Sequence, residues 1–263
     1  MKQEKVTTTE WDAASYEELA DPMTRWGAKF LELVELRGDE AVVDAGCGTG
    51  RVTELLLGRL TGGTVLAVDV SEKMVAAAAE RFAGDERVKV EQQDLLELNA
   101  GDPVDVIFST ATFHWILDHD RLFRRLSENL KPGGLLAAQC GGTGNVARVL
   151  ETAQEIMREE RFRETFDGWT DAKHFADPKT TKARLERAGF EKIETWLHEE
   201  PTKFDSVEKL APYLRTVILR QHVAELPEDE RDAFVRAVAG RMAEKGMPVV
   251  DYVRLNILAR RSG

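Results

Sequence analysis

The first half of the chain alternates short apolar runs with segments in which apolar residues recur every three or four positions. Five apolar runs are expected to form strands, at residues 41–45, 64–70, 87–91, 104–109 and 135–140. Helical spacing marks three of the segments between them, at residues 51–60, 72–82 and 120–130. Strands that are apolar throughout and separated by helices indicate a parallel sheet with helices on both faces. The pattern therefore predicts an α/β fold with a doubly wound sheet.

The second half has longer helical segments and two candidate strands. Helices are expected at residues 145–164 and 171–188, and amphipathic helices at residues 206–223 and 228–245. Residues 191–198 are expected to form a strand, and residues 252–259 alternate apolar and polar side chains as a strand does. Before the sheet, residues 11–36 predict one or two helices. Because no repeat or low-complexity linker separates the halves, we expect one domain in which the later helices cover a single sheet.

The chain is acidic, and this narrows the classes of partner. Its formal net charge is −11 over 263 residues, which would repel nucleic acid and the surface of an anionic membrane. Cys47 and Cys140 cannot make a disulfide framework, and no Cys/His cluster has the spacing of zinc ligands. Residues 1–12 are polar, and no apolar run approaches the ~18 residues of a membrane span. We therefore expect a cytoplasmic protein without a metal, a membrane or a nucleic acid as partner.

The turn after the first strand carries the most specific pattern in the chain. Its sequence is Asp44-Ala45-Gly46-Cys47-Gly48-Thr49-Gly50, with glycines at the spacing G-x-G-x-G. A dinucleotide fingerprint would place the third glycine one residue later, and the Gly-Lys-Ser/Thr of a phosphate-binding P-loop is missing. Glycines let the backbone pass close beneath a ligand. The acid that precedes them suits a cation better than a phosphate, so Asp44, Gly46 and Gly48 are candidate ligand-binding residues.

Two further acids follow the next two predicted strands. Asp69 ends the second strand, where a carboxylate can accept hydrogen bonds from both hydroxyl groups of a ribose. It would also repel a 2′-phosphate. Asp94 follows the third strand and can accept a hydrogen bond from an adenine amino group. Together with Asp44, these acids predict a pocket for an adenosine that carries positive charge.

With these residues the chain resembles the class I S-adenosylmethionine-dependent methyltransferases, over residues 42–140 and 191–259. Within that family it looks most like the trans-aconitate methyltransferase-like subgroup of small-molecule enzymes. The motifs that carry this finer resemblance are Trp11-Asp12-x-x-x-Tyr16, Phe108-Ser109, His114-Trp115-Ile116-x-Asp118-His119, Lys131-Pro132-Gly133-Gly134-Leu135 and Gln139.

The resemblance implies the cofactor and the residues that hold it. The cofactor is S-adenosyl-L-methionine, which leaves as S-adenosyl-L-homocysteine after methyl transfer. Around its methionine part the resemblance places Tyr16, Arg25, Asp44, Gly46, Gly48 and Ser109. Arg25 is the candidate for the cofactor's carboxylate, which needs a cation or amide donors. Around its adenosine part it places Asp69 at the ribose, and Val70, Met74, Asp94 and Leu95 at the adenine.

The resemblance also implies the architecture. It predicts a Rossmann-like sheet of seven strands in the order 3-2-1-4-5-7-6, with the last strand antiparallel and helical insertions as a lid. Residues 1–38 would form an N-terminal helical lid and residues 39–143 the cofactor-binding core. Residues 144–188 and 205–247 would form a helical roof over the substrate, and residues 189–204 and 248–263 the last two strands.

The expected reaction is in-line methyl transfer to a small-molecule acceptor, in which the protein contributes mainly positioning. An oxygen acceptor is favoured; a carboxylate needs no base, whereas a hydroxyl or a carbon acid needs one. His114, just past the fourth strand, is the candidate base, although a histidine between Phe113 and Trp115 is often a packed core residue. Nitrogen or carbon acceptors, and a non-catalytic module that only binds the cofactor, stay open as alternatives. Nucleic-acid methylation is disfavoured by the net charge and by Ser109-Thr110-Ala111-Thr112-Phe113, which lacks the Asn/Asp-Pro-Pro-Tyr/Phe motif.

The predicted roof holds a basic run and several aromatic side chains. Arginines at 148, 158, 161 and 163 are interleaved with glutamates at 155, 159, 160 and 164, which predicts a solvated, salt-bridged helix face. Other roof residues that can touch an acceptor are Phe166, Trp169, His174, Tyr213, Arg215 and Arg220. The sequence identifies no acceptor and no oligomeric state.

Overall fold

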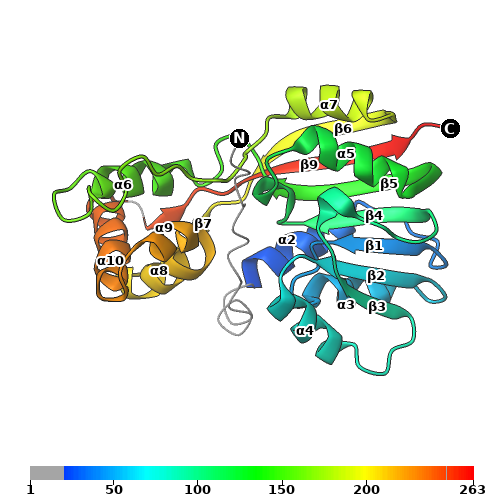
Figure 1. Cartoon of the computed structure of the whole chain (residues 1–263), viewed down its shortest axis with the longest axis horizontal. Helices are drawn as coiled ribbons and strands as arrows, with labels where there is room; N and C mark the ends of the chain where they lie inside the picture. The colour runs from blue at the N-terminus through cyan, green and yellow to red at the C-terminus, as the bar shows by residue number, and fades with distance from the viewer. Residues whose placement is uncertain (1–20, 247) are drawn as a thin grey trace, which may run out of the picture.

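The computed structural model describes residues 21–246 and 248–263, and its centre is a seven-stranded sheet (Figure 1). The strand order is β3-β2-β1-β4-β5-β9-β6, with β9 antiparallel to both neighbours and the other pairs parallel. The strands are β1 (Ala41–Ala45), β2 (Thr64–Asp69), β3 (Val88–Gln92), β4 (Val104–Thr110), β5 (Leu130–Gly141), β6 (Phe190–Glu199) and β9 (Val253–Arg261). This order confirms the predicted topology, because β9 is the seventh strand of the sheet along the chain.

Helices cover both faces of this sheet because its central strands are apolar on both sides. Neighbouring residues such as Val42 and Val43 point to opposite faces, and both are buried. One face packs against α2 (Asp21–Leu31), α3 (Arg51–Arg59) and α4 (Glu72–Arg81). The other face packs against α5 (His119–Glu128) and α7 (Pro178–Arg187). The parallel strands end at one edge, so the loops that follow β1, β2, β3 and β4 meet there.

A second group of helices lies beyond one end of the sheet, at the left of Figure 1. This helical lobe consists of α6 (Ala147–Met157), α8 (Val207–Tyr213), α9 (Arg220–Glu225), α10 (Glu228–Glu244) and the loops between them. The lobe has its own hydrophobic core, to which Phe162, Leu214 and Phe234 belong. Met23 and Trp26 of α2 join the same cluster, so α2 connects the lobe to the sheet. A short strand pair, β7 (Thr202–Lys203) and β8 (Val249–Val250), lies between the two parts along the chain.

The helices of the second half are shorter than their apolar patterns predict. The chain forms turns after Met157, so α6 ends seven residues before the expected limit of 164. α7 begins only at Pro178, because Asp177 Oδ1 accepts a hydrogen bond from the Thr180 amide at 2.8 Å and caps the helix there. The expected helix 206–223 is divided into α8, a π-helical turn (Leu214–Ile218) and α9. Pro212 lies inside α8 and removes one of its amide donors.

The basic run of the helical lobe also differs from the expected self-paired helix face. Glu155 pairs with Lys245 at 2.8 Å and Glu159 with Arg241 at 3.0 Å, so both glutamates are tied to the end of α10. Arg161 pairs with Glu230 at 2.7 Å, at the start of that helix. The expected pairing within one helix was wrong because residues 158–168 form turns, which do not keep the helical spacing. These ion pairs instead fasten α6 and the turns after it to α10.

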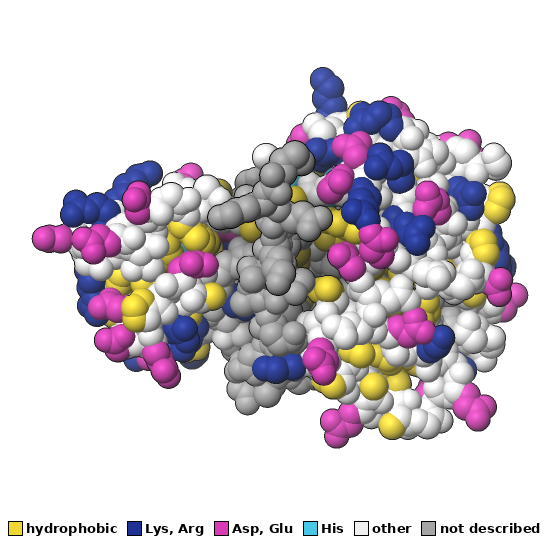
Figure 2. Space-filling model, in the orientation of Figure 1, with side chains coloured by type: hydrophobic (Ala, Val, Ile, Leu, Met, Phe, Trp, Pro, Cys, Tyr) yellow, Lys and Arg dark blue, Asp and Glu magenta, His cyan; other side chains and the backbone are white. Residues whose placement is uncertain are grey.

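Charges of both signs are mixed on the surface. On the face shown in Figure 2, lysine and arginine side chains are interspersed with acidic ones over the sheet and over the helical lobe. In residues 21–246 and 248–263, no helix combines the length and the apolar character that crossing a bilayer requires.

Two glycines, one just before β2 and one in α3, give a matched test of the packing. A Cβ at Gly63 would overlap the carbonyl oxygen of Glu40 and lie 3.0 Å from its amide nitrogen, and neither backbone atom can move away easily. Gly63→Ala is therefore expected to lower the free energy of unfolding by about 1–3 kcal/mol. Gly58 lies in the last turn of α3, and apart from its chain neighbours and the backbone of its own helix no atom of the described residues is within 4 Å of the position that its Cβ would take. Gly58→Ala is therefore expected to raise the free energy of unfolding by about 0.5–1 kcal/mol. Urea unfolding of both variants measures the difference, and shifts of equal sign would contradict this packing.

Candidate active site

The glycine loop after β1 folds back over the end of β2. The amides of Gly46 and Cys47 both donate to the carbonyl oxygen of Val68, at 2.8 and 2.9 Å. The amide of Gly48 donates to Asp69 Oδ2 at 3.0 Å. Gly46, Gly48 and Gly50 have φ angles of 84°, 55° and 87°, a region that side chains disfavour. The G-x-G-x-G spacing therefore reflects a tight backbone turn at the carboxyl edge of the sheet.

The three glycines of this loop are needed for different reasons. A Cβ at Gly46 would overlap the side chain of Thr112, and a Cβ at Gly50 would lie 2.5 Å from the ring of Phe82. Both positions are thus filled by the protein itself. Apart from Gly48 itself and its two chain neighbours, no atom of the described residues lies within 4 Å of where a Cβ at Gly48 would be. At Gly48 the backbone is therefore open to the close approach of a ligand.

Asp44 lies beneath the loop, fully buried near the end of β1. Thr53 Oγ1 donates a hydrogen bond to Asp44 Oδ2 at 2.6 Å. The pKa of Asp44 is raised to about 7. Burial is the main cause; the hydrogen bond from Thr53 lowers the pKa, and the nearby charge of Asp69 raises it. The carboxyl group is therefore close to its titration midpoint at neutral pH, and a cation bound beside it would favour the ionised form.

Asp69 holds two loops at once. Besides the Gly48 amide, its carboxylate accepts a hydrogen bond from the Ser71 amide, at 2.9 Å. Ser71 in turn caps α4, since its hydroxyl accepts from the Met74 amide at 3.3 Å. Each carboxylate oxygen can accept more than one hydrogen bond, so Asp69 can still receive the two hydroxyls of a ribose. Beside it Met74 is buried, whereas Val70 is 42% exposed and offers an apolar surface.

Asp94 and Leu95 lie at the next loop of the same edge. Asp94 Oδ1 accepts from the Leu96 amide at 2.9 Å and so caps the short 3-10 helix Leu95–Glu97. Asp94 is exposed and Leu95 is buried. The capping bond explains why an acid stands at this position without any ligand, and it fixes where the carboxylate and the Leu95 backbone lie.

Ser109 and Thr112 hold the glycine loop from below. Ser109 Oγ donates to the Ala45 carbonyl oxygen at 2.6 Å, and Thr112 Oγ1 donates to the Gly46 carbonyl oxygen at 3.3 Å. Ser109 is almost completely buried, so its hydroxyl lies within the sheet edge rather than on an open surface. Arg25 is exposed on α2, and Tyr16 lies outside the described residues.

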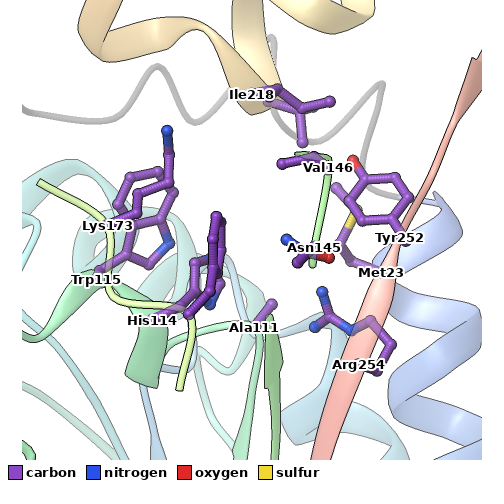
Figure 3. A pocket seen from close by; sticks show the side chains of 12 residues that line it. Met23, Ala111, His114, Trp115, Asn145, Val146, Lys173, Ile218, Tyr252 and Arg254 are labelled. Atoms are coloured by element: carbon purple, nitrogen blue, oxygen red, sulfur yellow. The ribbon is translucent and has the colours of Figure 1, made fainter. Parts of the chain in front are cut away.

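A pocket adjoins this edge between the sheet and the helical lobe (Figure 3). It is lined by Met23, Ala111, His114, Trp115, Asn145, Val146, Lys173, Phe175, Val217, Ile218, Tyr252 and Arg254. Two of these side chains are cationic, and none of the described residues that line it is acidic. In Figure 3 the Arg254 guanidinium, on β9, and the Asn145 amide point toward the middle of the pocket. We call this cavity the acceptor pocket.

Both cations of the acceptor pocket are buried against aromatic rings. Arg254 is 3% exposed, and its guanidinium lies 5.0 Å from the ring centre of Trp26. Lys173 Nζ lies 5.4 Å from the ring centre of Trp115 and 2.7 Å from the carboxylate of Asp171. Burial lowers the pKa of Lys173, while Asp171 opposes this shift. Because Lys173 and Asp171 neutralise each other, the positive charge of this pocket rests mainly on Arg254.

His114 forms part of the wall as a neutral ring. Its Nδ1 accepts a hydrogen bond from the Gly141 amide at 3.3 Å, which leaves the proton on Nε2. Burial, with the charges of Arg254 and Lys173, lowers the pKa of His114 well below the ordinary value. The ring stacks on Phe175 with centres 5.8 Å apart. His114 is therefore a hydrogen-bond donor at neutral pH and only a weak base.

Backbone strain gathers at the same pocket. Among the described residues, three non-glycine residues have positive φ, and two of them, Ala111 (56°) and Val146 (50°), line the acceptor pocket. Such conformations are costly and tend to persist at functional sites. Their position here marks the pocket independently of its charges.

Several site residues were not found by sequence reasoning. Arg254 and Lys173 were missed, as were the supporting hydroxyls of Thr53 and Thr112. For Arg254 a signal existed: Tyr252, Arg254 and Asn256 alternate along one strand, and such positions normally face solvent. The structure buries them at 5%, 3% and 3% exposure, because the helical lobe and α2 cover that side. Lys173 had no local signal, since it lies in an irregular segment.

Comparison with known proteins agrees with this geometry. A family model described as a methyltransferase domain matches residues 43–136. The chain is 31% identical over 270 residues to a trans-aconitate 2-methyltransferase of Methylobacterium nodulans, covering 96% of this chain and 99% of that protein. Haemonchus contortus phosphoethanolamine N-methyltransferase 2, in complex with phosphomonomethylethanolamine and S-adenosylhomocysteine, shares the fold. Its TM-score is 0.61 at 21% identity, covering 95% of this chain and 56% of that one.

The sheet order, with β9 antiparallel and a glycine loop at the carboxyl edge, defines a Rossmann-like methyltransferase fold. The [4+2]-cyclase SpnF has this fold too, with a TM-score of 0.58 at 18% identity over 91% of this chain and 81% of that one, so the fold alone does not decide the reaction. The reaction is decided by the relative from Methylobacterium nodulans, which matches over its full length. The chain belongs to the class I S-adenosylmethionine-dependent methyltransferases. It transfers a methyl group from S-adenosylmethionine to a small molecule, which confirms the predicted activity and cofactor.

Asp69→Ala is expected to weaken the binding of S-adenosylhomocysteine by about 1–3 kcal/mol, because a charged acceptor of hydrogen bonds is lost. Isothermal titration calorimetry measures the dissociation constant. Asp102→Ala, which removes an exposed acid before β4 at the opposite edge of the sheet, is the matched control and should leave it unchanged. An unchanged constant for Asp69→Ala would contradict the ribose role.

The raised pKa of Asp44 predicts a pH-dependent affinity. A cation bound beside Asp44, as the resemblance implies for the cofactor's ammonium, favours the ionised carboxylate, so the affinity for S-adenosylhomocysteine is expected to rise with pH through about 7. Below that value it should fall by up to about tenfold per pH unit. The free protein has the opposite dependence: because folding raises this pKa from 3.8 to about 7, the group's contribution to stability is lost progressively as pH rises from about 4 to about 7.

Calorimetric titrations between pH 6 and 8 test the linkage. Asp44→Asn cannot ionise, so its affinity should be lower and flat over this range. A wild-type slope that survives in Asp44→Asn would show that another group titrates.

Proposed function

We propose that this protein methylates a carboxylate oxygen of a small acid with several carboxylates. The observation that carries this proposal is the acceptor pocket beside the glycine loop, with buried Arg254 and Lys173 and no acidic lining among the described residues. Buried cations are stabilised by anionic partners, and arginine matches the planar geometry of a carboxylate. The name of the relative from Methylobacterium nodulans, trans-aconitate 2-methyltransferase, points to the same class of acceptor.

For the cofactor we propose the arrangement that the family resemblance implies. Asp69 accepts hydrogen bonds from the ribose, and Asp44 is the counter-charge for the ammonium. The exposed face of Val70, with Met74, Asp94 and the Leu95 amide, meets the adenine. Ser109 acts through the loop, since its bond to the Ala45 carbonyl keeps Gly46 and Gly48 beneath the methionine part. Arg25 and Tyr16 close over that part.

When bound, S-adenosylmethionine supplies a methyl group that is already activated by the sulfonium. The residues of the pocket then have three tasks. Arg254 holds a carboxylate of the acceptor, and Lys173, whose ammonium also pairs with Asp171, donates a hydrogen bond to a second carboxylate; both fix the acceptor's orientation. His114 Nε2–H donates a hydrogen bond to the acceptor. Met23 and Ile218 cover the pocket with apolar surface and keep water from the reacting atoms.

The state of His114 bears on the choice of acceptor. A carboxylate is ionised at neutral pH and needs no base. A hydroxyl acceptor would need one, and the strongly lowered pKa of His114 makes it a poor base near neutrality. This supports a carboxylate as the acceptor and a donor role for His114. The expected role as a base is needed only if a hydroxylated acceptor is the substrate.

A product assay tests the proposal. The protein is incubated with S-adenosylmethionine labelled at the methyl group and a panel that contains trans-aconitate, succinate, catechol and phosphoethanolamine. Label should enter the polycarboxylic acids and be released as methanol by mild alkali, because the product is a methyl ester. Alkali-stable label, or label only in catechol or phosphoethanolamine, would overturn it.

Arg254→Gln is expected to raise KM for the labelled acid by at least about tenfold, the scale of one lost charge-assisted hydrogen bond. The affinity for S-adenosylhomocysteine should change little. The matched control is Arg260→Gln on the same strand, where the side chain is exposed and bonds to the Gly133 carbonyl. An unchanged KM in Arg254→Gln would remove this residue from the acceptor site.

A further inference from the structure

The helical lobe contains a second cavity that shares no lining residue with the acceptor pocket. It lies between α6, the turns that follow it and α9, and has a volume of about 600 Å³. Its wall combines the apolar side chains of Leu150, Met157, Phe166 and Trp169 with polar and charged groups. A cavity of this size and mixture is typical of sites for small organic molecules. We call it the lobe cavity.

Two arginines give the lobe cavity its positive charge. Arg158 and Arg163 line it, and in the part of the chain that the structure describes neither guanidinium has an ion pair or a hydrogen bond. Two glutamates close to these arginines in the sequence form ion pairs with other residues: Glu155 with Lys245 and Glu159 with Arg241. Both guanidinium groups are thus available to an anion in the cavity.

A buried imidazole faces the same space. His222 of α9 lines the lobe cavity and is 2% exposed, and among the described residues its Nδ1 has no hydrogen-bond partner. Burial lowers the pKa of His222 to about 4, so the ring is neutral. Its centre lies 4.4 Å from the ring of Trp169. Buried polar atoms without a partner are rare and call for an explanation, which a bound ligand would supply.

The charges of the lining define the ligand's own charge. Asp171 also lines the lobe cavity, but its carboxylate is neutralised by Lys173 at 2.7 Å. Asp167 offsets one of the two arginines. The cavity therefore has a net charge of one positive unit, which matches a monoanion.

We propose that the lobe cavity is a binding site for an organic monoanion with a flat apolar body, of the class of aromatic monocarboxylates. The carboxylate lies between Arg158 and Arg163, and the ring packs against Phe166 and Trp169 within hydrogen-bonding reach of His222. This site is separate from the one for the methyl acceptor. The Asp171–Lys173 ion pair lies between the two, since Asp171 lines one cavity and Lys173 the other.

The test uses 1-naphthoate as the probe and the full chain with saturating S-adenosylhomocysteine, so that the adenine site is filled. Isothermal titration calorimetry should give one binding event per chain, weakened by added salt. Naphthalene-1-carboxamide, which has the same shape without the charge, should bind at least about tenfold more weakly. The double variant Arg158→Gln/Arg163→Gln should lose a similar factor for 1-naphthoate.

Two control variants locate the probe. Arg161→Gln removes an arginine between the other two that pairs with Glu230 and does not line the cavity, and it should bind 1-naphthoate like the wild type. Arg254→Gln should also bind it normally, and this separates the lobe cavity from the acceptor pocket. The proposal is overturned if 1-naphthoate gives no heat, if the double variant binds it unchanged, or if Arg254→Gln abolishes binding. Circular dichroism of each variant checks that the fold is retained.

Discussion

The carboxylate of Asp69 is the link on which the cofactor side of the molecule depends. It accepts from the Gly48 amide in the loop after β1 and from the Ser71 amide at the start of α4, so one ionised group fixes two loops on neighbouring strands. Hydrogen bonds to a charged group contribute about 1.5–3 kcal/mol each. The open backbone at Gly48, the cap of α4 and the apolar surface at Val70 all keep their relative positions because of this side chain. A residue expected to bind the ribose therefore also builds the surface around it.

Charge is divided between the two halves of the site. Asp44 and Asp69 place carboxyl groups on the cofactor side, whereas Arg254 places a buried guanidinium on the acceptor side, where Lys173 is paired with Asp171. This arrangement suits a cationic donor and an anionic acceptor, which lose their charges as the methyl group passes. Such a reaction is favoured where water is excluded, because the transition state is less charged than the reactants. The proposed reaction would thus give the apolar covering from α2 and the helical lobe a chemical role as well as a packing role.

The features of the fold and the site that could be predicted from the sequence are those marked by a local sequence pattern. Asp44 and Asp69 each end an apolar strand, and the glycine spacing marks the turn between them, so both lie where a doubly wound sheet requires. Helix ends in the second half were less predictable, because the apolar spacing continues past the Asp177 cap and through Pro212. Arg254 and Lys173 join His114 only through tertiary packing of distant segments. A polar position in an alternating strand normally indicates solvent, and only the helical lobe makes it a buried site.

The acceptor side rests on the hydrogen-bond ladder of β9. This strand pairs with β5 and β6, and Asn256 bonds to Gln139 at 2.8 Å two residues from Arg254. Because side chains alternate along a strand, a shift of one residue in this pairing would turn the guanidinium to the opposite side of the sheet. A substitution at residue 254 would therefore change the chemical group that faces the pocket, while the backbone pairing keeps the position of that group. A different side chain at this position would thus enter the pocket from the same point of the backbone.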